Sequence, residues 1–596
     1  LSTNFESNDY GIYISGINNA KILKNRFIIG KNKNNITSRP VGLYIQNGSG
    51  FRIEENLFEN NVVPNLEKIG LNIKNSGKDN NQTYKNRFKN LTFGQIFDGN
   101  NCSQRSPATG LVSLCNKNTD NIKFDFWVRP IVGCYNGINP YQDAIINTGS
   151  GLDTVSAGNQ FSSVSSIDIQ YNNEGNYLFY KYNPNNTNEI LEIYTPTTIT
   201  RESSSENPCR SKINALYPDI IDAELASITL DYTNLKYNYN QLIDAGNTPE
   251  MLQLIQGEWS DDIWNLRVEL LGQSPYLSQD AILMVAMENL LPPALLLEVC
   301  IANPDATRSE EFLDQLRYKI PTPLPEYMIN MIRASWENKT LRTEMEKQLS
   351  AFKTYRDEYH NYKTEILLSD TIYNYNNIID HLESRGSYGD YLSMAEIAIS
   401  QNNFTQADIY LDILENSTEK FTEEEILEIA SFREYISIRE SIALNNKTIY
   451  NLDSAQIATL EIYAYSNNYR GAVLARNILC ALYDICIDDI PAPPRSLRVG
   501  SNEGNNHNNI PFIASVKVMP NPASEYAAFI WDMKSFDKSS VLYIYDQNGK
   551  IIVTQPIHTQ QGEWVWNVKN IPDGVYVYTF KSDQLVLFSG KLIISK

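Results

Sequence analysis

The N-terminal fold is decided by a figure that the chain repeats: GIYI (residues 11–14), GLYI (42–45) and GLNI (70–73), each followed by an Asn-x-Phe element. The glycines lie 31 and 28 residues apart, and the Asn-x-Phe elements 31 and 30. Repetition at such a period is typical of a solenoid, in which each unit is too small to bury its own face. Short apolar alternations after glycine favour strands over helices. We therefore expect stacked coils built of short strands.

This figure resembles the right-handed parallel β-helix over residues 5–165, in pattern only. The resemblance implies that equivalent asparagines share amide hydrogen bonds along the stack and that equivalent phenylalanines stack inside. Because the repeat is under way at residue 11 without a preceding cap, we expect residues 1–165 to be the C-terminal coils of a longer array. Residues 166–210 are assigned to a β-rich closing segment. The stacked side chains would be Asn25, Asn56 and Asn86, with Phe27, Phe58 and Phe88.

Many β-helix proteins act on polysaccharides, so the carboxylates of this region were weighed as catalytic groups. Hydrolysis requires an acid and a base paired across the bond. Glu54 and Glu55 are adjacent, so on a strand they would point to opposite faces, and Asp98 begins a DGN turn. We predict no catalytic residues here, and the alternative of a polysaccharide-active enzyme places its catalytic coils outside this segment. The candidates were Glu54, Glu55, Asp98, Asp120 and Asp125.

Charge separates the middle of the chain from the rest. Residues 211–490 hold 44 acidic and 20 basic side chains, whereas the remainder holds 26 acidic and 30 basic. Without a clustered basic surface, the chain is not expected to bind nucleic acid. Helical periodicity runs through residues 211–490, which predicts an α-helical module with an acidic, solvated surface. No apolar stretch of about 18 residues exists, so we expect no transmembrane helix.

Two stretches of this module, residues 395–414 and 460–479, match at an offset of 65. Both predict a helix, an Asn-Asn-aromatic turn and a second helix with an early alanine. The pattern is similar to a tetratricopeptide-type hairpin, and an ordinary helical bundle remains the alternative. A long element is also expected from Pro325 to about Leu367, with Arg356, Asp357 and Glu358 pointing outward.

The seven cysteines form neither a C-x-x-C motif nor a zinc-type cluster. Cys480 and Cys486 lie six residues apart on a predicted helix, so they are not expected to bond unless the helix breaks. His360 and His381 lack a third ligand, and no metal or cofactor is expected. Four cysteines are candidates for disulfides whose connectivity stays open, with Cys102–Cys115 and Cys134–Cys209 as plausible pairs.

The C-terminal region alternates polar and apolar residues with period two. A Pro-rich, then polar stretch over residues 491–511 predicts a linker. Beyond it, Asn548-Gly549 and Asp573-Gly574 mark two turns between alternating segments. Residues 512–596 are therefore expected to form a small antiparallel β-sandwich of about seven strands.

The order of motifs in this sandwich resembles the type A C-terminal sorting domain of type IX secretion, the outer-membrane export route of Bacteroidetes. The matching stretches are VMPNPA (518–523), DQNGK (546–550), GVY (574–576) and GKLII (590–594). The resemblance implies recognition by a shuttle protein and the translocon pore at the outer membrane, then cleavage by a peptidase in the linker. The predicted partner-binding residues are Pro520, Asn521, Pro522, Ala523, Gly549, Gly574, Tyr576, Gly590, Lys591, Leu592, Ile593 and Ile594.

Three Asp-Ser/Thr-apolar triplets match the O-glycosylation pattern of such organisms, which makes Thr154, Thr371 and Ser454 candidate sites. The sequence thus predicts a non-enzymatic cargo that is secreted or displayed at the cell surface by way of the periplasm. Its β-helix would offer an adhesin-like surface to glycans or cells. A helical scaffold for a protein complex is a further alternative.

Overall fold

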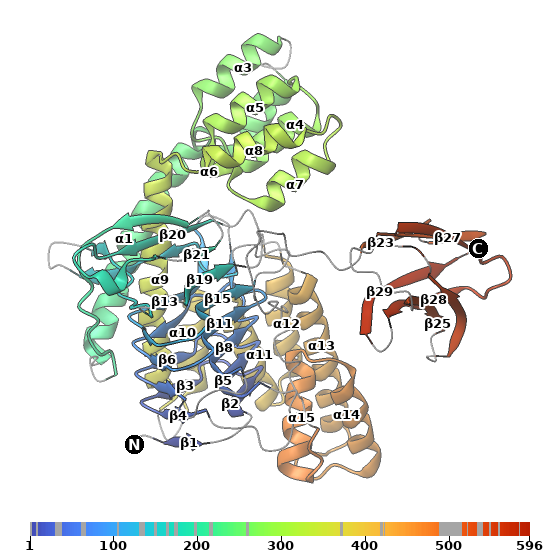
Figure 1. Cartoon of the computed structure of the whole chain (residues 1–596). Coiled ribbons are helices and arrows are strands. Elements are labelled where there is room, and N and C mark those ends of the chain that lie inside the picture. The colour runs from blue at the N-terminus through green and yellow to red at the C-terminus, as the bar shows by residue number, and fades with distance from the viewer. Residues whose placement is uncertain are drawn as a thin grey trace. The chain divides into compact units, whose positions relative to one another are not determined.

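The computed structural model divides the chain into two compact units, Leu1–Pro493 and Pro494–Lys596. Each is described by itself below (Figure 1). The structure describes all residues except 1–2, 7–9, 30–38, 61–66, 104–106, 130–136, 148–151, 163–165, 172–176, 193, 196–198, 214–217, 258–261, 370–372, 418–420, 422, 488–514, 521, 533–539, 547–549, 558, 560, 583–584 and 596.

Three sheets of mostly parallel strands build the first part of the N-terminal unit, and neighbours within each sheet come from successive turns of the chain. The first sheet contains β1 (Asn4–Glu6), β4 (Arg26–Ile28), β7 (Leu57–Glu59), β10 (Arg87–Lys89) and β14 (Lys117–Thr119). The second contains β2 (Tyr10–Ser15), β5 (Val41–Gln46), β8 (Ile69–Lys74), β11 (Phe93–Asp98), β15 (Phe124–Arg129), β19 (Ile167–Tyr171) and β21 (Tyr194–Thr195). The third contains β3 (Lys21–Leu23), β6 (Arg52–Glu54), β9 (Asn81–Tyr84), β13 (Thr109–Leu114) and the antiparallel β12 (Cys102–Ser103).

The repeated asparagines form a continuous ladder at the corner between the third and first sheets. Asn25 Nδ2 donates to Asn56 Oδ1 at 3.2 Å, Asn56 to Asn86 at 3.0 Å, and Asn86 to Asn116 at 3.1 Å. The residue before each asparagine is left-handed, with φ between 54° and 58° at Lys24, Glu55, Lys85 and Cys115. The expected asparagine stack is confirmed, and each buried amide is satisfied by its neighbours.

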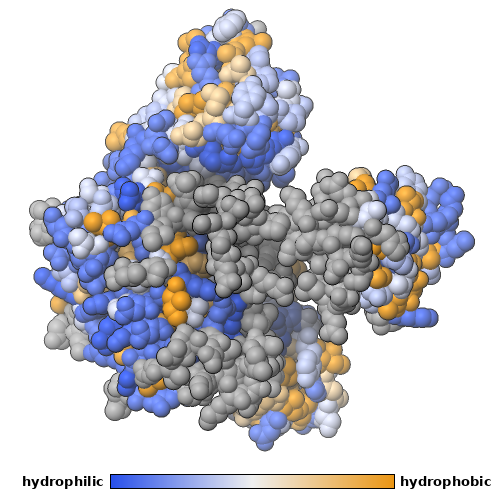
Figure 2. All heavy atoms as spheres, in the orientation of Figure 1, coloured by the Kyte–Doolittle hydropathy of each residue, from blue (hydrophilic) through white to orange (hydrophobic). Residues whose placement is uncertain are grey.

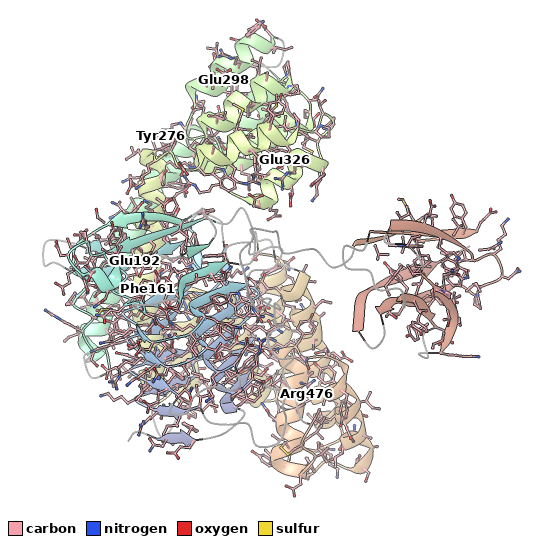
Figure 3. The ribbon with its side chains drawn as sticks, viewed as in Figure 1. Phe161, Glu192, Tyr276, Glu298, Glu326 and Arg476 are labelled. Atoms are coloured by element: carbon pink, nitrogen blue, oxygen red, sulfur yellow. A yellow bond between two sulfur atoms is a disulfide. The ribbon has the colours of Figure 1, made fainter. Side chains whose placement is uncertain are left out.

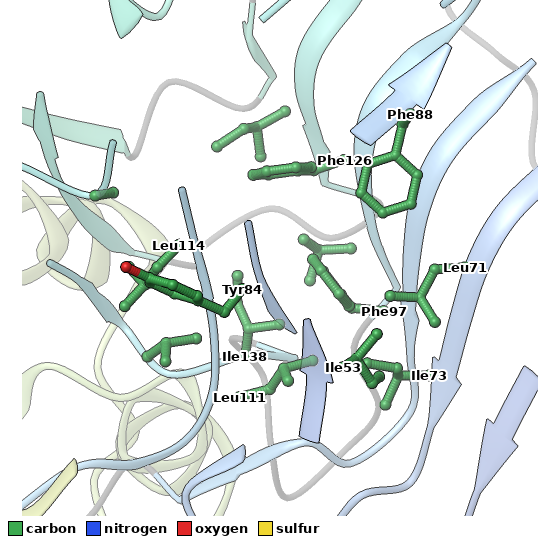
Figure 4. Close-up of a cluster of buried hydrophobic side chains, with 14 of the residues drawn as sticks. Ile53, Leu71, Ile73, Tyr84, Phe88, Phe97, Leu111, Leu114, Phe126 and Ile138 are labelled. Atoms are coloured by element: carbon green, nitrogen blue, oxygen red, sulfur yellow. The ribbon is translucent and has the colours of Figure 1, made fainter. Parts of the chain in front are cut away.

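The interior of the three sheets is filled by the repeated aromatic and aliphatic residues. Phe27, Phe58 and Phe88 stack with ring centroids 4.6 and 5.0 Å apart, as expected. A Cβ on Gly42 would lie 2.7 Å from both the Gly70 carbonyl oxygen and the Phe58 ring, so the repeated glycine lets neighbouring turns approach closely. Figure 4 shows Leu71, Ile73 and Phe97 gathered between the strands, with Tyr84 and Leu114 side by side at the edge of the same cluster.

Smaller strands follow this stack. They are β16 (Tyr141–Gln142), β20 (Leu178–Tyr182) and β22 (Ile199–Ser203) in one sheet, and the hairpin β17 (Ala144–Asn147) and β18 (Leu152–Val155), with the 3-10 turn η1 (Thr187–Glu189). Phe161, labelled in Figure 3, packs on Phe126 and Tyr180 and joins this part to the main core.

The disulfides differ from the expected pairs. Cys115 bonds Cys209, with Cα atoms 5.6 Å apart, so the pairings Cys102–Cys115 and Cys134–Cys209 are wrong. The cause is that the segment after β22 returns alongside the corner at Cys115. Cys102 is disulfide-bonded as well, and Cys134 lies outside the described residues.

Cys480 and Cys486 bond each other, with Cα atoms 4.2 Å apart, and the helix break that this bond was expected to require is present. The helix that carries Cys480 ends at Tyr483, and Asp484 turns the chain back with φ 56°. Among the described residues, Cys300 is the free cysteine, and it is buried.

The described residues between Pro218 and Tyr483 form a series of helices joined by loops. The helices are α1 (Pro218–Leu242), η2 (Ile243–Gly246), α2 (Thr248–Gln256), α3 (Ile263–Gly272), α4 (Gln279–Met287), α5 (Pro293–Ala302), α6 (Pro304–Thr307), α7 (Glu310–Tyr318), α8 (Glu326–Ser335), α9 (Leu341–Leu367), α10 (Tyr375–Arg385), α11 (Tyr388–Ser400), α12 (Phe404–Glu415), α13 (Glu423–Leu444), α14 (Ser454–Ser466) and α15 (Arg470–Tyr483). Helices α2–α8 share one hydrophobic core and α10–α15 another. Figure 2 shows hydrophobic residues exposed among hydrophilic ones over α3–α8.

The two matching stretches form helical hairpins, α11–α12 and α14–α15, as predicted. Ala407 and Ala472 are fully buried at the equivalent positions of the second helices. Arg476, labelled in Figure 3, donates to the Ala464 carbonyl oxygen at 2.7 Å and ties α15 to the end of α14. The expected long element from Pro325 is instead two helices, α8 and α9, and Asp357 is 2% exposed rather than outward.

We call the three stacked sheets the coils. The helices pack on the coils through buried polar contacts. Asn80 Nδ2 donates to Asp357 Oδ2 at 2.8 Å, and a guanidinium nitrogen of Arg470 donates to Asn18 Oδ1 at 2.8 Å. Asp79 accepts the backbone N–H of Gly389 at 2.8 Å. These contacts explain why the coils and helices form one compact unit.

The C-terminal unit contains two antiparallel sheets over one core. β23 (Ser515–Met519), β24 (Tyr526–Asp532) and β27 (Gln561–Asn567) form one sheet. The other has the order β26 (Ile551–Pro556), β25 (Ser540–Tyr545), β28 (Gly574–Ser582), β29 (Leu585–Ile594). Phe529 from the first sheet and Phe580 from the second are both fully buried in the shared core, so antiparallel strands form here as predicted.

Candidate functional site: the C-terminal sorting motifs

The first and last of the C-terminal motifs meet in space. Ala523 donates its N–H to the Ile593 carbonyl oxygen at 2.8 Å, and Ser595 donates to the Ala523 carbonyl oxygen at 2.9 Å. Ala523 and Ile594 form an isolated parallel bridge. The turn after β23 therefore clamps the end of the last strand. Ser595 was missed by sequence reasoning, and only its position beside the last motif could have pointed to it.

The clamp is buried rather than displayed. Ala523 and Leu592 are fully buried and Ile594 is 1% exposed. Tyr576 is 6% exposed, and its hydroxyl donates to the Pro572 carbonyl oxygen at 2.7 Å. Burial, followed by the nearby Asp546 and Asp573, raises the pKa of Tyr576, so the phenol stays neutral and donates.

The last strand is an edge strand that pairs with β28 along its length. Leu592 lies opposite Tyr576, and Ile594 opposite Gly574. Gly590 and Lys591 lie in the same ladder, opposite Tyr578 and Val577. Ile593 points outward and is 43% exposed. Of the described side chains of this strand, Leu592 and Ile594 are therefore anchored in the core, and Ile593 between them is exposed.

The remaining predicted residues surround this arrangement. Pro520 and Pro522 lie between β23 and Ala523, whereas Asn521 and Gly549 lie outside the described residues. Lys550 donates its N–H to Asp546 Oδ1 at 2.9 Å.

The carboxylates weighed for catalysis are held by neighbours. Glu54 contacts Arg52 at 3.0 Å, and burial raises its pKa. Glu55 lies 3.3 Å from Lys85, and Asp98 pairs with Arg129 at 2.5 Å. Asp125 accepts from Asn121 and Ser162, and burial raises its pKa to about 6. Asp120 occupies a left-handed corner with φ 53°.

His360 and His381 stack on each other with centroids 3.7 Å apart. The Nε2 of His360 lies 2.8 Å from the His381 carbonyl oxygen, and the Nε2 of His381 lies 3.0 Å from the His360 carbonyl oxygen. Burial lowers the pKa of His360 to about 3 and of His381 to about 4, so both rings are neutral. No group of three metal-ligating side chains occurs within the described ranges.

Two of the three candidate glycosylation residues are described. Thr154 lies on β18, where its N–H bonds to Asp153 Oδ1 at 2.8 Å and its hydroxyl accepts from Lys181. Ser454 begins α14, and the preceding Asp453 caps that helix. Thr371 lies outside the described residues.

Comparison with known proteins identifies one family. Residues 517–595 match the model of the secretion system C-terminal sorting domain. This match supports export by the type IX route to the cell surface or the medium. No curated protein matches the chain. In the described part of the chain, no helix is long and apolar enough to cross a membrane.

Two solved structures have partial likeness to the chain. Dimeric latent PorU from Porphyromonas gingivalis is 24% identical over 14% of this chain and 9% of its own, with a TM-score of 0.13. Alkylpurine DNA glycosylase AlkC of Pseudomonas fluorescens, bound to DNA containing an abasic site analog, is 11% identical over 63% of this chain and 99% of its own, with a TM-score of 0.11. At these TM-scores neither structure bears on the fold.

Proposed function

We propose that the chain is a cargo of the type IX secretion system and that residues 512–596 are its translocation signal. The family match over residues 517–595 carries this proposal. The clamped end strand supports it, because the first and last motifs form one arrangement that a partner can recognise.

Recognition would use β29, because many partners bind by adding a strand to the edge of a sheet. β29 is the edge strand of its sheet, and Ala523 already pairs with its end. The partners would be the outer-membrane shuttle protein and the translocon pore, with a peptidase cutting in the linker at residues 491–511. Residues 590–594 would be the part that the shuttle protein and the pore recognise.

The N-terminal unit would be the passenger. We assign residues 1–165 to a right-handed parallel β-helix, residues 166–210 to its closing segment and residues 211–490 to a helical module. The strand order, with one strand per turn of chain in each sheet, supports this assignment. The passenger would bind glycans or cells. Glu54, Glu55 and Asp98 are engaged with basic side chains, which supports assigning no catalytic role to them. The alternative of a polysaccharide-active enzyme is not favoured, because the matched family is a sorting domain.

The export proposal is tested by deleting residues 512–596 from the chain in a host with type IX secretion. Fractionation should find the intact chain at the surface or in the medium and the truncated chain in the periplasm. Surface delivery of the truncated chain at the normal level would overturn the proposal. Mass spectrometry of the exported protein would test Thr154, Thr371 and Ser454, and three unmodified residues would exclude glycosylation there.

A further inference from the structure

Two cavities lie between α9 and the third sheet of the coils. Their volumes are 380 and 240 Å³, and the larger falls in the range of small-molecule sites, about 300–1,000 Å³. Both are lined by Gln82, Tyr84, Thr354, Glu358 and Tyr362, so they meet at a common wall. Here the Lys212 ammonium bridges sheet and helix, 3.2 Å from Gln82 Oε1 and 2.6 Å from Glu358 Oε1. We call the two cavities together the α9 groove.

The sheet side of the groove is formed by alternate residues on the strands of the third sheet. Leu114, Tyr84 and Glu54 are register partners across three strands, and so are Val112, Gln82 and Arg52. All six side chains line the groove. Thr83 and Ser113, which lie between them on β9 and β13, bond to each other inside the coils, and Ile53 on β6 also borders the smaller cavity. The stacking of coils thus lays two parallel rows of side chains across the groove floor.

The helix side supplies tyrosines from one face of α9. Tyr355, Tyr359 and Tyr362 follow the i, i+4, i+7 spacing of a single helix face. The hydroxyls of Tyr355 and Tyr359 are 3.0 Å apart, and their rings are 4.8 Å apart. Both residues are half-buried and line the larger cavity. Tyr141 adds a ring from the sheet side.

The charges of the groove are balanced. Arg52 pairs with Glu54 at 3.0 Å and with Glu365 at 3.1 Å, and Lys212 pairs with Glu358. Asp143, in the larger cavity, lies 3.7 Å from Lys181, and burial raises its pKa to about 6. An ionic ligand would have to displace one of these pairs, which costs binding free energy.

The roof of the groove is fixed before any ligand arrives. The Cys115–Cys209 disulfide holds the segment that carries Arg210 and Lys212. The Arg210 carbonyl oxygen accepts the Tyr84 hydroxyl at 2.9 Å, and the Lys212 N–H donates to Glu54 Oε1 at 2.7 Å. A preformed site loses little conformational entropy on binding.

We propose that the α9 groove binds a neutral oligosaccharide, with sugar rings lying on Tyr355 and Tyr359 and hydroxyls bonded to Gln82 and neighbouring amides. This deepens the proposed glycan-binding role of the passenger and rests on it. A sugar ring combines an apolar C–H face with a rim of hydroxyls, which matches aromatic rings among amides and already paired charges. Two adjoining cavities suit a chain of sugars better than a single sugar does.

The test is isothermal titration calorimetry of the intact chain with cellohexaose, xylohexaose, mannohexaose, laminarihexaose and maltohexaose, and with oligogalacturonate as an anionic probe. At least one neutral oligosaccharide should bind. Tyr359→Ala should weaken that binding at least ten-fold, and Gln82→Ala, which spares the aromatic packing, several-fold. Tyr237→Ala, at a 64% exposed tyrosine on α1, is the matched control and should change it less than two-fold.

Binding of none of the neutral sugars, binding of oligogalacturonate only, or unchanged binding by Tyr359→Ala would overturn the inference. The export test is independent of these results. Normal export without sugar binding would remove the groove assignment alone, and sugar binding without signal-dependent export would remove the cargo assignment alone.

Discussion

In the coil region and in the C-terminal unit alike, residues of the sequence motifs meet in buried contacts. The two regions differ in how far apart along the chain the contacting residues lie. In the coils, Asn56 and Asn86 meet because they are 30 residues apart, one turn of chain. In the C-terminal unit, Ala523 meets Ile593 across nearly the whole unit. The contacts within a repeat can therefore be predicted from its period. For the C-terminal motifs, the sequence gives their order along the chain but not which of them touch.

The largest expected effect comes from a substitution that breaks the asparagine ladder of the coils. Asn86 accepts from Asn56 and donates to the Ile53 carbonyl oxygen and to Asn116, all inside the core. Asn86→Leu leaves these groups unpaired, so we expect the free energy of unfolding of the N-terminal unit to fall by about 3–5 kcal/mol. Urea unfolding of the intact chain measures it.

The matched control for this change is Asn25→Leu at the exposed end of the ladder, which should cost about 1 kcal/mol. Equal losses from the two substitutions would show that the ladder does not stabilise the coils from within.

The next largest effect concerns the disulfide that joins Cys115 to the segment after β22. The Cys115–Cys209 disulfide closes a loop with a sequence separation of 94 residues. Replacing both residues with serine should lower stability by about 2–4 kcal/mol, because the unfolded chain regains loop entropy. The Cys480→Ser/Cys486→Ser pair, with a separation of 6, should cost less, and urea unfolding of the two double variants measures both losses. The reverse order would contradict this account.

A smaller effect depends on pH. His360 and His381 have pKa values lowered to about 3 and 4, so the folded chain keeps them neutral while the unfolded chain protonates them below about pH 6.5. Their contribution to stability is therefore present above pH 6.5 and lost as the pH falls toward 4. Between pH 7 and 4.5 we expect each of the two rings to account for about 2–3 kcal/mol of lost stability.

Chemical denaturation across this pH range would measure the effect, with His360→Phe/His381→Leu as the comparison. The double variant should show a shallower pH dependence than the natural chain. An unchanged slope would mean that other groups carry the acid sensitivity.

The same contrast decides which parts of the structure could be predicted from the sequence. The asparagine and phenylalanine stacks were predictable because equivalent residues recur at one period. The helical hairpins at 395–414 and 460–479 were predictable because their turns carry the same Asn-Asn-aromatic signal. The α9 groove was not, because Tyr84 and Tyr362 are far apart in the chain and nothing local links them.

Errors arose where long-range contacts override local pattern. The cysteine pairs depend on where the segment after β22 returns, which spacing does not reveal. Asp357 was expected to face solvent as part of a charged run, but it is buried against Asn80, Lys353 and Arg356. The C-terminal motifs were recognised correctly as a group, yet their burial could not be inferred from their order.

The central claim is that the clamped end strand of the C-terminal unit is the export signal. The most direct test is cell fractionation of the intact chain carrying Ala523→Glu, which places a carboxylate in a fully buried position beside Ile593. Tyr526→Glu, at a 52% exposed position of the same unit, is the control. We predict at least ten-fold less surface or secreted protein for Ala523→Glu, with accumulation in the periplasm, and normal export for Tyr526→Glu. Normal export of Ala523→Glu would contradict the claim.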